Sequence, residues 1–413
     1  MLHVRDKSIQ KNMLAGKFEI IKDMLRVDED GFMSHLDLDG VIDSKFCDCR
    51  LEIRSGIQPS AAKAVAELEA RTKAVQKTLK EHNELLWPFS APPYIRDWND
   101  IVVKDHCGPC EYLAQKYGRY KMTLCGVHLN FSFDDQFLKD EFRLANYHNF
   151  AEFKDRMYLH LAKQMALYGW LITLLTAASP LTDTSFVQKG VYDGAVFSGL
   201  ASLRNSEIGF WNHFTPCFEY SNLERYVKSI EQYVEEDLLQ FPAELFFPVR
   251  LLPAGVPNFM SLKENGVDRI ELRMFDLNPY EVSGIDVRDI EFAHLFMIWL
   301  VSLQPFWISR KDSVQLVQNF KNASHYDLKT VYIHSNEEDV IPMIESAMNL
   351  VEEVEIFFKD ADEHVQDVIQ YEKMKCRSVK NRYAYKILKD FSEDFVKCGV
   401  KLAKENQEKI LEN

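Results

Sequence analysis

The segment CGVHLNFSF, residues 125–133, alternates polar and apolar side chains along most of its length. Successive side chains of a β-strand point to opposite faces, so His128, Asn130 and Ser132 would share one face. The residues between them are leucine and phenylalanine, which suit a buried face. The pattern predicts a strand with one polar face and one apolar face.

Three further segments have the same two-residue period: FEIIKDML (residues 18–25), FCDCRLEI (46–53) and DRIELRMF (268–275). One face of each would carry the following sets: Glu19, Ile21 and Asp23; Asp48, Arg50 and Glu52; Arg269, Glu271 and Arg273. A polar stripe on a single antiparallel strand is usually its solvated face. Four such strands, rich in carboxylate, imidazole and guanidinium groups, also allow a concave polar face on which these groups converge.

Carboxylates that converge repel one another unless a cation lies among them. Asp and Glu oxygens suit Mg²⁺, which usually also keeps phosphate oxygens in its shell. Arg273 follows Glu271 by two residues on the same face, where it could stabilise a phosphoryl group during transfer. The residues by themselves therefore indicate a candidate metal and phosphate site on the sheet, and nothing more specific.

Helical spacing of apolar residues marks the rest of the chain. Predicted helices cover residues 60–86, 149–178, 223–239, 292–303 and much of the tail from about residue 337. The second should end before Ser179 and Pro180, because the residue before a proline disfavours the helical conformation. No internal repeat, low-complexity tract or linker divides the chain.

Composition excludes several classes of protein. The 413 residues carry 49 Lys and Arg against 63 Asp and Glu, a net charge of −14, which argues against a nucleic-acid binder. A hydrophobic content of 46% excludes a mostly disordered chain. The longest apolar stretch, residues 165–178, is shorter than the roughly 20 residues that span a membrane. The opening residues have no apolar core of signal-peptide length, so we expect a soluble, cytoplasmic protein.

Several segments together resemble the bacterial glutamate–cysteine ligases. They are CGVHLNFSF, SLRNSEIGF (Ser202–Phe210), ELFFPVR (Glu244–Arg250) and IELRMFDLNPYEVSGID (Ile270–Asp286), in the order of that family. The resemblance implies an α+β fold of the glutamine-synthetase-like type, with a curved, largely antiparallel sheet whose polar active face binds substrates and whose other face is covered by helices. It implies a single ligase domain over residues 1–413, with a strand-rich core at about 15–305 and a helical part at about 306–413.

The same resemblance implies an ATP-dependent, ADP-forming ligase that uses Mg²⁺. ATP would phosphorylate the γ-carboxylate of glutamate, and the amino group of cysteine or of another amine would attack the γ-glutamyl phosphate. The implied partners are small molecules, with no nucleic acid or membrane, and the oligomeric state stays open. The alternative is a catalytically weakened homologue that binds nucleotide or glutamate without turnover.

Residue roles follow from the motif positions. The resemblance implies metal binding by five residues: Asp23, Glu52, Glu111, His128 and Glu271. It implies that Arg273 holds the γ-phosphate and that Arg204, with Asn130, binds glutamate. Each of these could instead be an ordinary surface or core residue.

Two departures from the family bear on metal and acceptor binding. Ile21 stands where the family usually has the first of two acidic residues, which places an alkyl group at an expected ligand position. Phe210 and Phe246 stand where related ligases have tyrosines thought to contact the carboxylate of the acceptor cysteine. Loss of two hydroxyl donors makes the pocket apolar, with Phe46 as a further lining residue; the substitutions are either sequence drift or the sign of a changed acceptor, an amine without a carboxylate or a different amino acid.

The cysteine pairs allow a third function class. Cys110 takes a place where the family often has a basic residue, and it closes the CGPC motif that begins at Cys107. Together with Cys47 and Cys49, this pair could form a zinc site or a redox centre. We expect four reduced thiols, because the spacing is not that of a usual zinc motif and the motif lacks the context of a thioredoxin.

Overall fold

The computed structural model describes residues 13–36, 45–104, 107–188, 191, 194–255, 259–334 and 340–412. Its centre is an antiparallel sheet with the strand order β2-β1-β4-β8-β7, and β3 pairs with β1. The strands are β1 (Gly16–Val27), β2 (Arg50–Arg54), β3 (Leu85–Trp87), β4 (Val127–Phe133), β7 (Val249–Leu252) and β8 (Arg269–Phe275). The largely antiparallel sheet predicted from the resemblance is confirmed.

One predicted strand is shorter than expected. The alternating segment 46–53 was expected to be extended throughout, but β2 begins only at Arg50. Cys47 makes an isolated bridge with Val103, and the turn after it leads into the strand. Alternation within residues 46–49 therefore comes from a turn, whose side chains do not follow the face rule of a strand.

The strand register places the polar residues on one face. Asp23 lies opposite Glu52 in the β1–β2 pair, and Asn130 lies opposite Glu271 in the β4–β8 pair. Directly opposed residues of antiparallel strands project from the same face, so these four side chains share it. The predicted polar face is confirmed.

Helices cover the other face of the sheet. They include α2 (Ala61–Glu81), which contacts β1 and β2, α15 (Phe395–Glu412), which contacts β3, and α10 (Val287–Ser302), which packs on α2. Ser60 begins α2 because its hydroxyl accepts a hydrogen bond from the Lys63 amide. Buried residues at helical spacing, such as Ala64 and Leu68, then face the sheet.

The apolar stretch at residues 165–178 lies mainly in the core. It spans the end of α5 (Phe150–Tyr168) and all of α6 (Trp170–Thr176), and every residue of α6 is buried. The helix ends before Ser179 and Pro180. No helix in the described part of the chain is long and apolar enough to cross a membrane.

The C-terminal part is mainly helical, with one small sheet that was not predicted. Its elements are α11 (Arg310–Ala323), α12 (Met343–Phe357), α13 (Glu363–Arg377), α14 (Tyr383–Phe391) and α15, and β9 (Tyr332–His334) pairs with β10 (Val340–Pro342). Buried apolar residues of this part and of the strand-rich part belong to one hydrophobic cluster.

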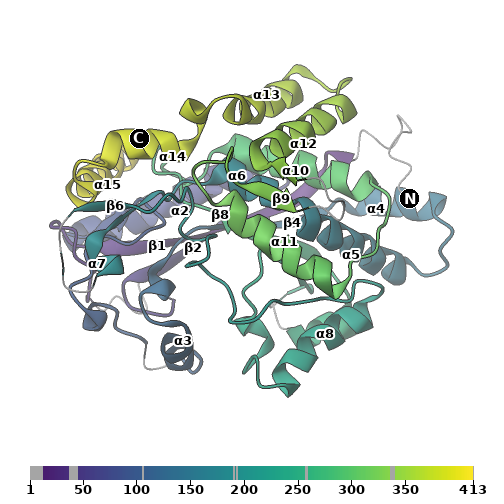
Figure 1. Ribbon diagram of the computed structural model, residues 1–413, viewed down its shortest axis with the longest axis horizontal. Helices are drawn as coiled ribbons and strands as arrows, with labels where there is room; N and C mark the ends of the chain where they lie inside the picture. The colour runs from purple at the N-terminus through teal and green to yellow at the C-terminus, as the bar shows by residue number, and fades with distance from the viewer. Residues whose placement is uncertain are drawn as a thin grey trace.

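The remaining elements surround the sheet. They are α3 (Cys110–Tyr117), α4 (Asp135–Leu144), α7 (Thr184–Val187), α8 (Leu223–Glu235), α9 (Phe259–Asn265) and the pair β5 (Leu181–Asp183) and β6 (Ala195–Phe197). Figure 1 shows α3 and α8 below the sheet and α13 and α15 above it. The polar face therefore looks toward the side of α3 and α8.

Candidate active site

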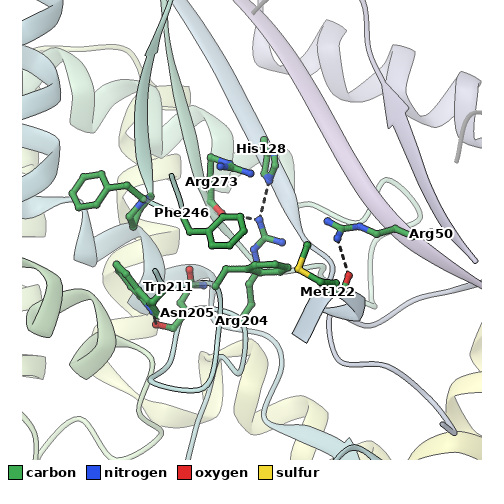
Figure 2. A pocket seen from close by; sticks show the side chains of 11 residues that line it. Arg50, Met122, His128, Arg204, Asn205, Trp211, Phe246 and Arg273 are labelled. Carbon is green, nitrogen blue, oxygen red and sulfur yellow. Dashed lines mark hydrogen bonds between the residues drawn. The ribbon is translucent and has the colours of Figure 1, made fainter. Parts of the chain in front are cut away.

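Two adjoining cavities lie on the polar face of the sheet. The smaller, of about 110 Å³, is lined mainly by basic and aromatic side chains. The larger, of about 260 Å³, extends along the strands toward α8 and is lined by Glu19, Glu52 and Glu271 among others. His128 and Arg273 line both cavities, so they stand at the junction. Figure 2 shows the smaller cavity, with His128 and Arg273 together on one side of it.

His128 on β4 is fixed in one tautomer. Its Nε2 atom is 2.8 Å from Arg204 Nη2, which can only donate, so Nε2 accepts and the proton lies on Nδ1. Nδ1 is 3.5 Å from Glu271 Oε1. Burial and the positive charge of Arg273 lower the pKa of His128, although Glu271 opposes this. The imidazole is therefore neutral at pH 7 and joins Glu271 to Arg204.

Arg204 is a buried cation with an unused donor. Its Nη2 also donates to the Arg273 carbonyl oxygen at 3.1 Å, whereas Nη1 has no hydrogen-bond partner among the described residues. Burial lowers the pKa of Arg204 to about 10, so it stays charged at neutral pH. A buried guanidinium with a free donor at a cavity suits a carboxylate or phosphate oxygen.

Gly126 explains part of the CGVH motif. A Cβ atom at this position would lie 2.7 Å from Arg204 Nε and 2.6 Å from the Phe275 carbonyl oxygen. Only glycine lets the guanidinium lie directly on the start of β4. The motif thus positions Arg204 as well as supplying His128.

Asp276 holds the loop that carries Arg204. Its carboxylate accepts hydrogen bonds from the Ala178 amide at 2.9 Å, from the Ser179 hydroxyl at 2.8 Å and from the Ser202 hydroxyl at 3.1 Å. Burial raises the pKa of Asp276 to about 6, although these donors oppose the rise. Asp276 was not among the predicted site residues, because nothing in FDLNP shows which distant hydroxyls the aspartate would meet.

Phe210 and Phe246 line the smaller cavity, with ring centroids 5.5 Å apart, and their role in binding the acceptor stays a prediction. The guanidinium groups of Arg204 and Arg50 lie 5.5 and 5.9 Å from the Phe210 centroid. The cavity therefore combines aromatic walls with cations.

The prediction that Phe46 lines this pocket is wrong. Phe46 is buried but lines neither cavity, and its φ of 68° places it in the left-handed region, in the turn before β2. Its carbonyl oxygen accepts a hydrogen bond from the Lys104 amide. The cause is the late start of β2, which removes residue 46 from the strand alternation.

Asn130 and Arg273 occupy different places relative to the cavities. Asn130 lines only the larger cavity, donates to Glu19 Oε2 at 3.0 Å, and its Oδ1 atom has no hydrogen-bond partner among the described residues. Arg273 lines both cavities and its Nε lies 3.7 Å from Glu271 Oε2. The glutamate and phosphate roles of these residues stay predictions.

The carboxylates predicted to bind metal have basic partners instead. Asp23 Oδ2 is 2.7 Å from Arg50 Nη2, and although burial raises the pKa of Asp23, Arg50 and its neighbours lower it to about 2. Glu52 contacts two further cations, Lys45 Nζ at 3.1 Å and Arg54 Nη2 at 2.5 Å.

The negative charge of Glu271 is likewise balanced by neighbouring groups. Arg273, His128 and Arg250 hold its pKa well below the ordinary value despite its burial. No group of three or more His, Cys, Asp or Glu in the described ranges is arranged to hold a metal ion. As they stand, these residues do not fit a magnesium cluster, although Glu52, His128 and Glu271 line the same cavity.

Glu111 lies apart from the other predicted ligands. Its side chain on α3 is 53% exposed, lines neither cavity, and contacts Arg119 Nη2 at 3.6 Å. Cys110 and Tyr117 form the buried side of this short helix, which leaves Glu111 on its open side. The family resemblance of this stretch does not specify its helical phase.

Besides Asp276, the predictions missed one residue of the larger cavity and one residue that supports the site from outside it. Arg250 on β7 lies opposite Glu271 and lines the larger cavity, and burial lowers its pKa to about 9. Its position between Val249 and Leu251 follows the two-residue period and could have revealed it. Glu244 is buried and accepts hydrogen bonds from Tyr117 at 2.7 Å and from Lys116 at 2.5 Å, which ties α3 to the segment before Phe246.

The four motif cysteines do not form one site. Cys107 and Cys110 are joined by a disulfide, so the expectation of reduced thiols is wrong for this pair. Cys47 and Cys49 are free, with their sulfur atoms 3.3 Å apart. A tetrathiolate zinc site needs all four thiolates to converge, and here two are oxidised to each other.

The sequence matches the family described as glutamate-cysteine ligase over residues 2–323. It is 28% identical over 437 aligned positions to a glutathione biosynthesis bifunctional protein GshAB of Clostridium perfringens, covering 97% of this chain and 55% of that protein. It is 33% identical over 319 positions to a GshAB protein of Listeria welshimeri, covering 71% of this chain and 41% of that protein. The chain thus spans about half the length of the curated relatives that it matches.

Two solved structures have a similar fold. One is a bifunctional glutathione synthetase from Pasteurella multocida, with a TM-score of 0.85 and 21% identity, covering 100% of this chain and 55% of that one. The other is a glutamate–cysteine ligase from Francisella tularensis in complex with AMP, with a TM-score of 0.86 and 18% identity, covering 97% of this chain and 89% of that one. At these identities the likeness establishes the fold.

Proposed function

The chain belongs to the glutamate–cysteine ligase family, and on that premise we propose that it joins the γ-carboxyl group of glutamate to an amine with the conversion of ATP to ADP and phosphate. The described part of residues 1–413 would form one ligase domain. The observation that carries the proposal is the pair of cavities that meet at His128 and Arg273, with Arg204, whose buried Nη1 has no hydrogen-bond partner among the described residues, lining the smaller one.

The chemistry requires an activated carboxyl group. An amine cannot displace an oxygen from a carboxylate at neutral pH. An oxygen of the glutamate γ-carboxylate therefore first attacks the terminal phosphorus of ATP, and ADP leaves. The amine then attacks the acyl carbon, inorganic phosphate leaves with the bond electrons, and the amine proton passes to solvent. In this scheme Arg273 balances the charge of the transferring phosphoryl group, and Arg204 holds a glutamate carboxylate.

His128 has an orienting role. Because Nε2 accepts from Arg204 and Nδ1 faces Glu271, the imidazole fixes the direction of the guanidinium. The neutral ring adds no positive charge of its own, so the guanidinium keeps its free donor for the ligand. Asn130 would contribute its unpaired Oδ1 to the ammonium group of glutamate.

The acceptor lies against Phe210 and Phe246 in this proposal. Their rings offer no hydroxyl donor, which favours an amine with an apolar side chain or without a carboxylate. Cysteine stays a candidate because Arg50 and Arg204, which stand over the Phe210 ring, could bind its carboxylate. An assay with a panel of amines therefore identifies the acceptor.

The test is release of ADP from ATP, Mg²⁺ and glutamate with a panel that contains cysteine, other amino acids and simple amines. We expect ADP formation that requires both glutamate and one acceptor, and its loss in Arg204→Gln. Arg143→Gln is the matched control, because Arg143 is 72% exposed on α4 and pairs with the neighbouring Asp140. ADP release with an amine but not with cysteine would identify a changed acceptor.

The second candidate is a homologue that binds nucleotide or glutamate without turnover. The ion pairs of Asp23 with Arg50 and of Glu52 with Lys45 and Arg54 favour it, because they occupy the carboxylates to which the family resemblance gives metal binding. Saturable binding of ATP or glutamate, without ADP release for any acceptor, would establish this candidate over the ligase.

A further inference from the structure

The larger cavity carries more positive than negative side chains. Among its described lining residues are five cations, Lys45, Arg54, Arg250, Arg269 and Arg273, against the three carboxylates Glu19, Glu52 and Glu271. With His128 neutral, the described lining has an excess of positive charge. A divalent cation would be repelled there, whereas a polyanion would be attracted.

The smaller cavity strengthens this charge pattern. Its described lining residues include Arg50, Arg204 and Arg273 but no aspartate or glutamate. Arg50 Nε and Arg204 Nη1 are buried without a hydrogen-bond partner among the described residues. Buried donors of this kind are normally satisfied, so they indicate an anionic ligand in the smaller cavity, which under the proposed function is a substrate carboxylate.

The carboxylate of Glu52 forms ion pairs with cations at the larger cavity. Glu52 lies between Lys45 Nζ and Arg54 Nη2, and both cations are about half exposed at the mouth of the site. Ile21, which lines the same cavity, lies opposite Arg54 on one side and His128 on the other. An alkyl group and a guanidinium thus stand side by side on the face where the family resemblance predicted a metal-bound carboxylate.

We propose that this face binds the phosphate groups of its nucleotide directly through arginine and lysine side chains, without a divalent cation held by Asp23, Glu52 or Glu271. The identity of the nucleotide rests on the proposed function. The excess of positive charge in the larger cavity and the ion pairs of Glu52 and Glu271 both favour direct binding of phosphate over binding of a metal ion. Glu52 positions Lys45 and Arg54 and competes with phosphate for them.

The first experiment measures ATP affinity by calorimetry on the purified full chain, with Mg²⁺ and then with EDTA. We expect equal or tighter binding in EDTA, because free ATP carries more negative charge than its magnesium complex. Paramagnetic resonance of added Mn²⁺ should show no ion bound to the protein alone. ATP affinity about tenfold weaker in EDTA, or stoichiometric Mn²⁺ binding that Glu52→Gln abolishes, would overturn the proposal.

Substitution of Glu52 changes ATP affinity in opposite directions, depending on whether its carboxylate holds a metal ion or pairs only with cations of the chain. If the side chain holds a metal ion, Glu52→Gln weakens ATP binding. If it only pairs with Lys45 and Arg54, the same change frees both cations, and ATP should bind equally well or more tightly. We expect the second result, and a loss of affinity contradicts the proposal.

The two cations are tested separately. Lys45→Gln and Arg54→Gln should each weaken ATP binding by about 5- to 10-fold and reduce its dependence on salt. Lys17→Gln is the matched control, because Lys17 lies on β1, is 46% exposed, pairs with Asp135 and lines neither cavity. Equal effects of all three variants would refute a specific phosphate site.

Inorganic triphosphate serves as a second probe and separates this proposal from the ligase activity. Metal-independent binding of triphosphate and ATP without ADP release would keep the phosphate site and reject the ligase. ADP release together with binding that requires a metal would keep the ligase and reject the phosphate site. Absence of binding by both probes would reject the site itself.

Discussion

Two buried charge clusters of this protein contain the same kinds of side chain but differ in completeness. In the helical part, Lys375 on α13 lies 2.6 Å from Asp289 Oδ1 and 2.9 Å from Glu372 Oε2, and the Tyr383 hydroxyl donates to Asp289. None of these residues lines the two cavities. On the polar sheet face, Arg204 keeps a buried donor unused beside a cavity.

The difference separates a structural cluster from a binding site. In the helical cluster Lys375 contacts both carboxylates, and although Glu372 Oε2 makes no hydrogen bond, it is ion-paired with Lys375 Nζ and Glu372 lines neither cavity. On the sheet face Arg204 Nη1 and Arg50 Nε are buried without a hydrogen-bond partner among the described residues, and both residues line the smaller cavity. Buried charge alone is thus no sign of function, whereas buried charge with a free atom at a cavity is.

The largest expected effect is on stability and concerns the helical cluster of Lys375, Asp289 and Glu372, which we call the closed cluster because it lines neither cavity. The cluster around Arg204 on the sheet face is called the open cluster. Lys375→Met leaves the Asp289 and Glu372 carboxylates together without their cation, and we expect the free energy of unfolding to fall by about 3–5 kcal/mol. Urea denaturation measures it. Lys397→Met, which removes an 81% exposed partner of Asp394, should leave stability unchanged. A small loss for Lys375→Met would mean that the cluster is not closed.

The next effect concerns a carboxylate that has hydrogen-bond donors but no cation in direct contact. The folded-state pKa of Asp276 is raised to about 6 from an ordinary 3.8, so the protonated form is favoured in the folded state. Its contribution to stability is therefore complete below about pH 4 and falls by about 3 kcal/mol as pH rises through 6. Urea denaturation between pH 4 and 7 should show this fall relative to Asp276→Asn, and parallel curves would contradict it.

A smaller effect on binding is expected at the open cluster. Arg204→Gln removes the free donor, so glutamate affinity measured by calorimetry should fall by about 10- to 100-fold. Its effect on unfolding should be below that of Lys375→Met, because cavity water can reach the vacated space. Equal losses of stability in the two variants would remove the distinction between the clusters.

The smallest effect is expected at the disulfide. Cys107→Ala/Cys110→Ala should cost at most about 2 kcal/mol, because the closed loop is short. Glutamate affinity should not change, since Tyr117 and Glu244 hold α3 independently of the disulfide. Glu244→Gln is the contrasting variant and should weaken binding. Thiol titration of the unreduced, denatured protein should find six free cysteines.

Local alternation determined much of this fold. The two-residue period predicted β1, β4 and β8, and the helical period predicted α2, α5, α6, α8 and α10. These patterns are local, because a residue's face depends only on its position along its own strand or helix. The sequence alone therefore placed His128, Glu52 and Glu271 on strands of a polar sheet.

Tertiary structure decided which groups meet. Alternation put Asp23 and Arg50 on polar faces of separate strands, but only the β1–β2 register brought them to 2.7 Å. The helical phase of α3 turned Glu111 outward, and the late start of β2 removed Phe46 from the cavity. Contacts between distant residues depend on register and packing, which one strand's sequence does not contain. For that reason local sequence determined which residues the polar face carries, while the three-dimensional arrangement decided that its carboxylates pair with the chain's own cations.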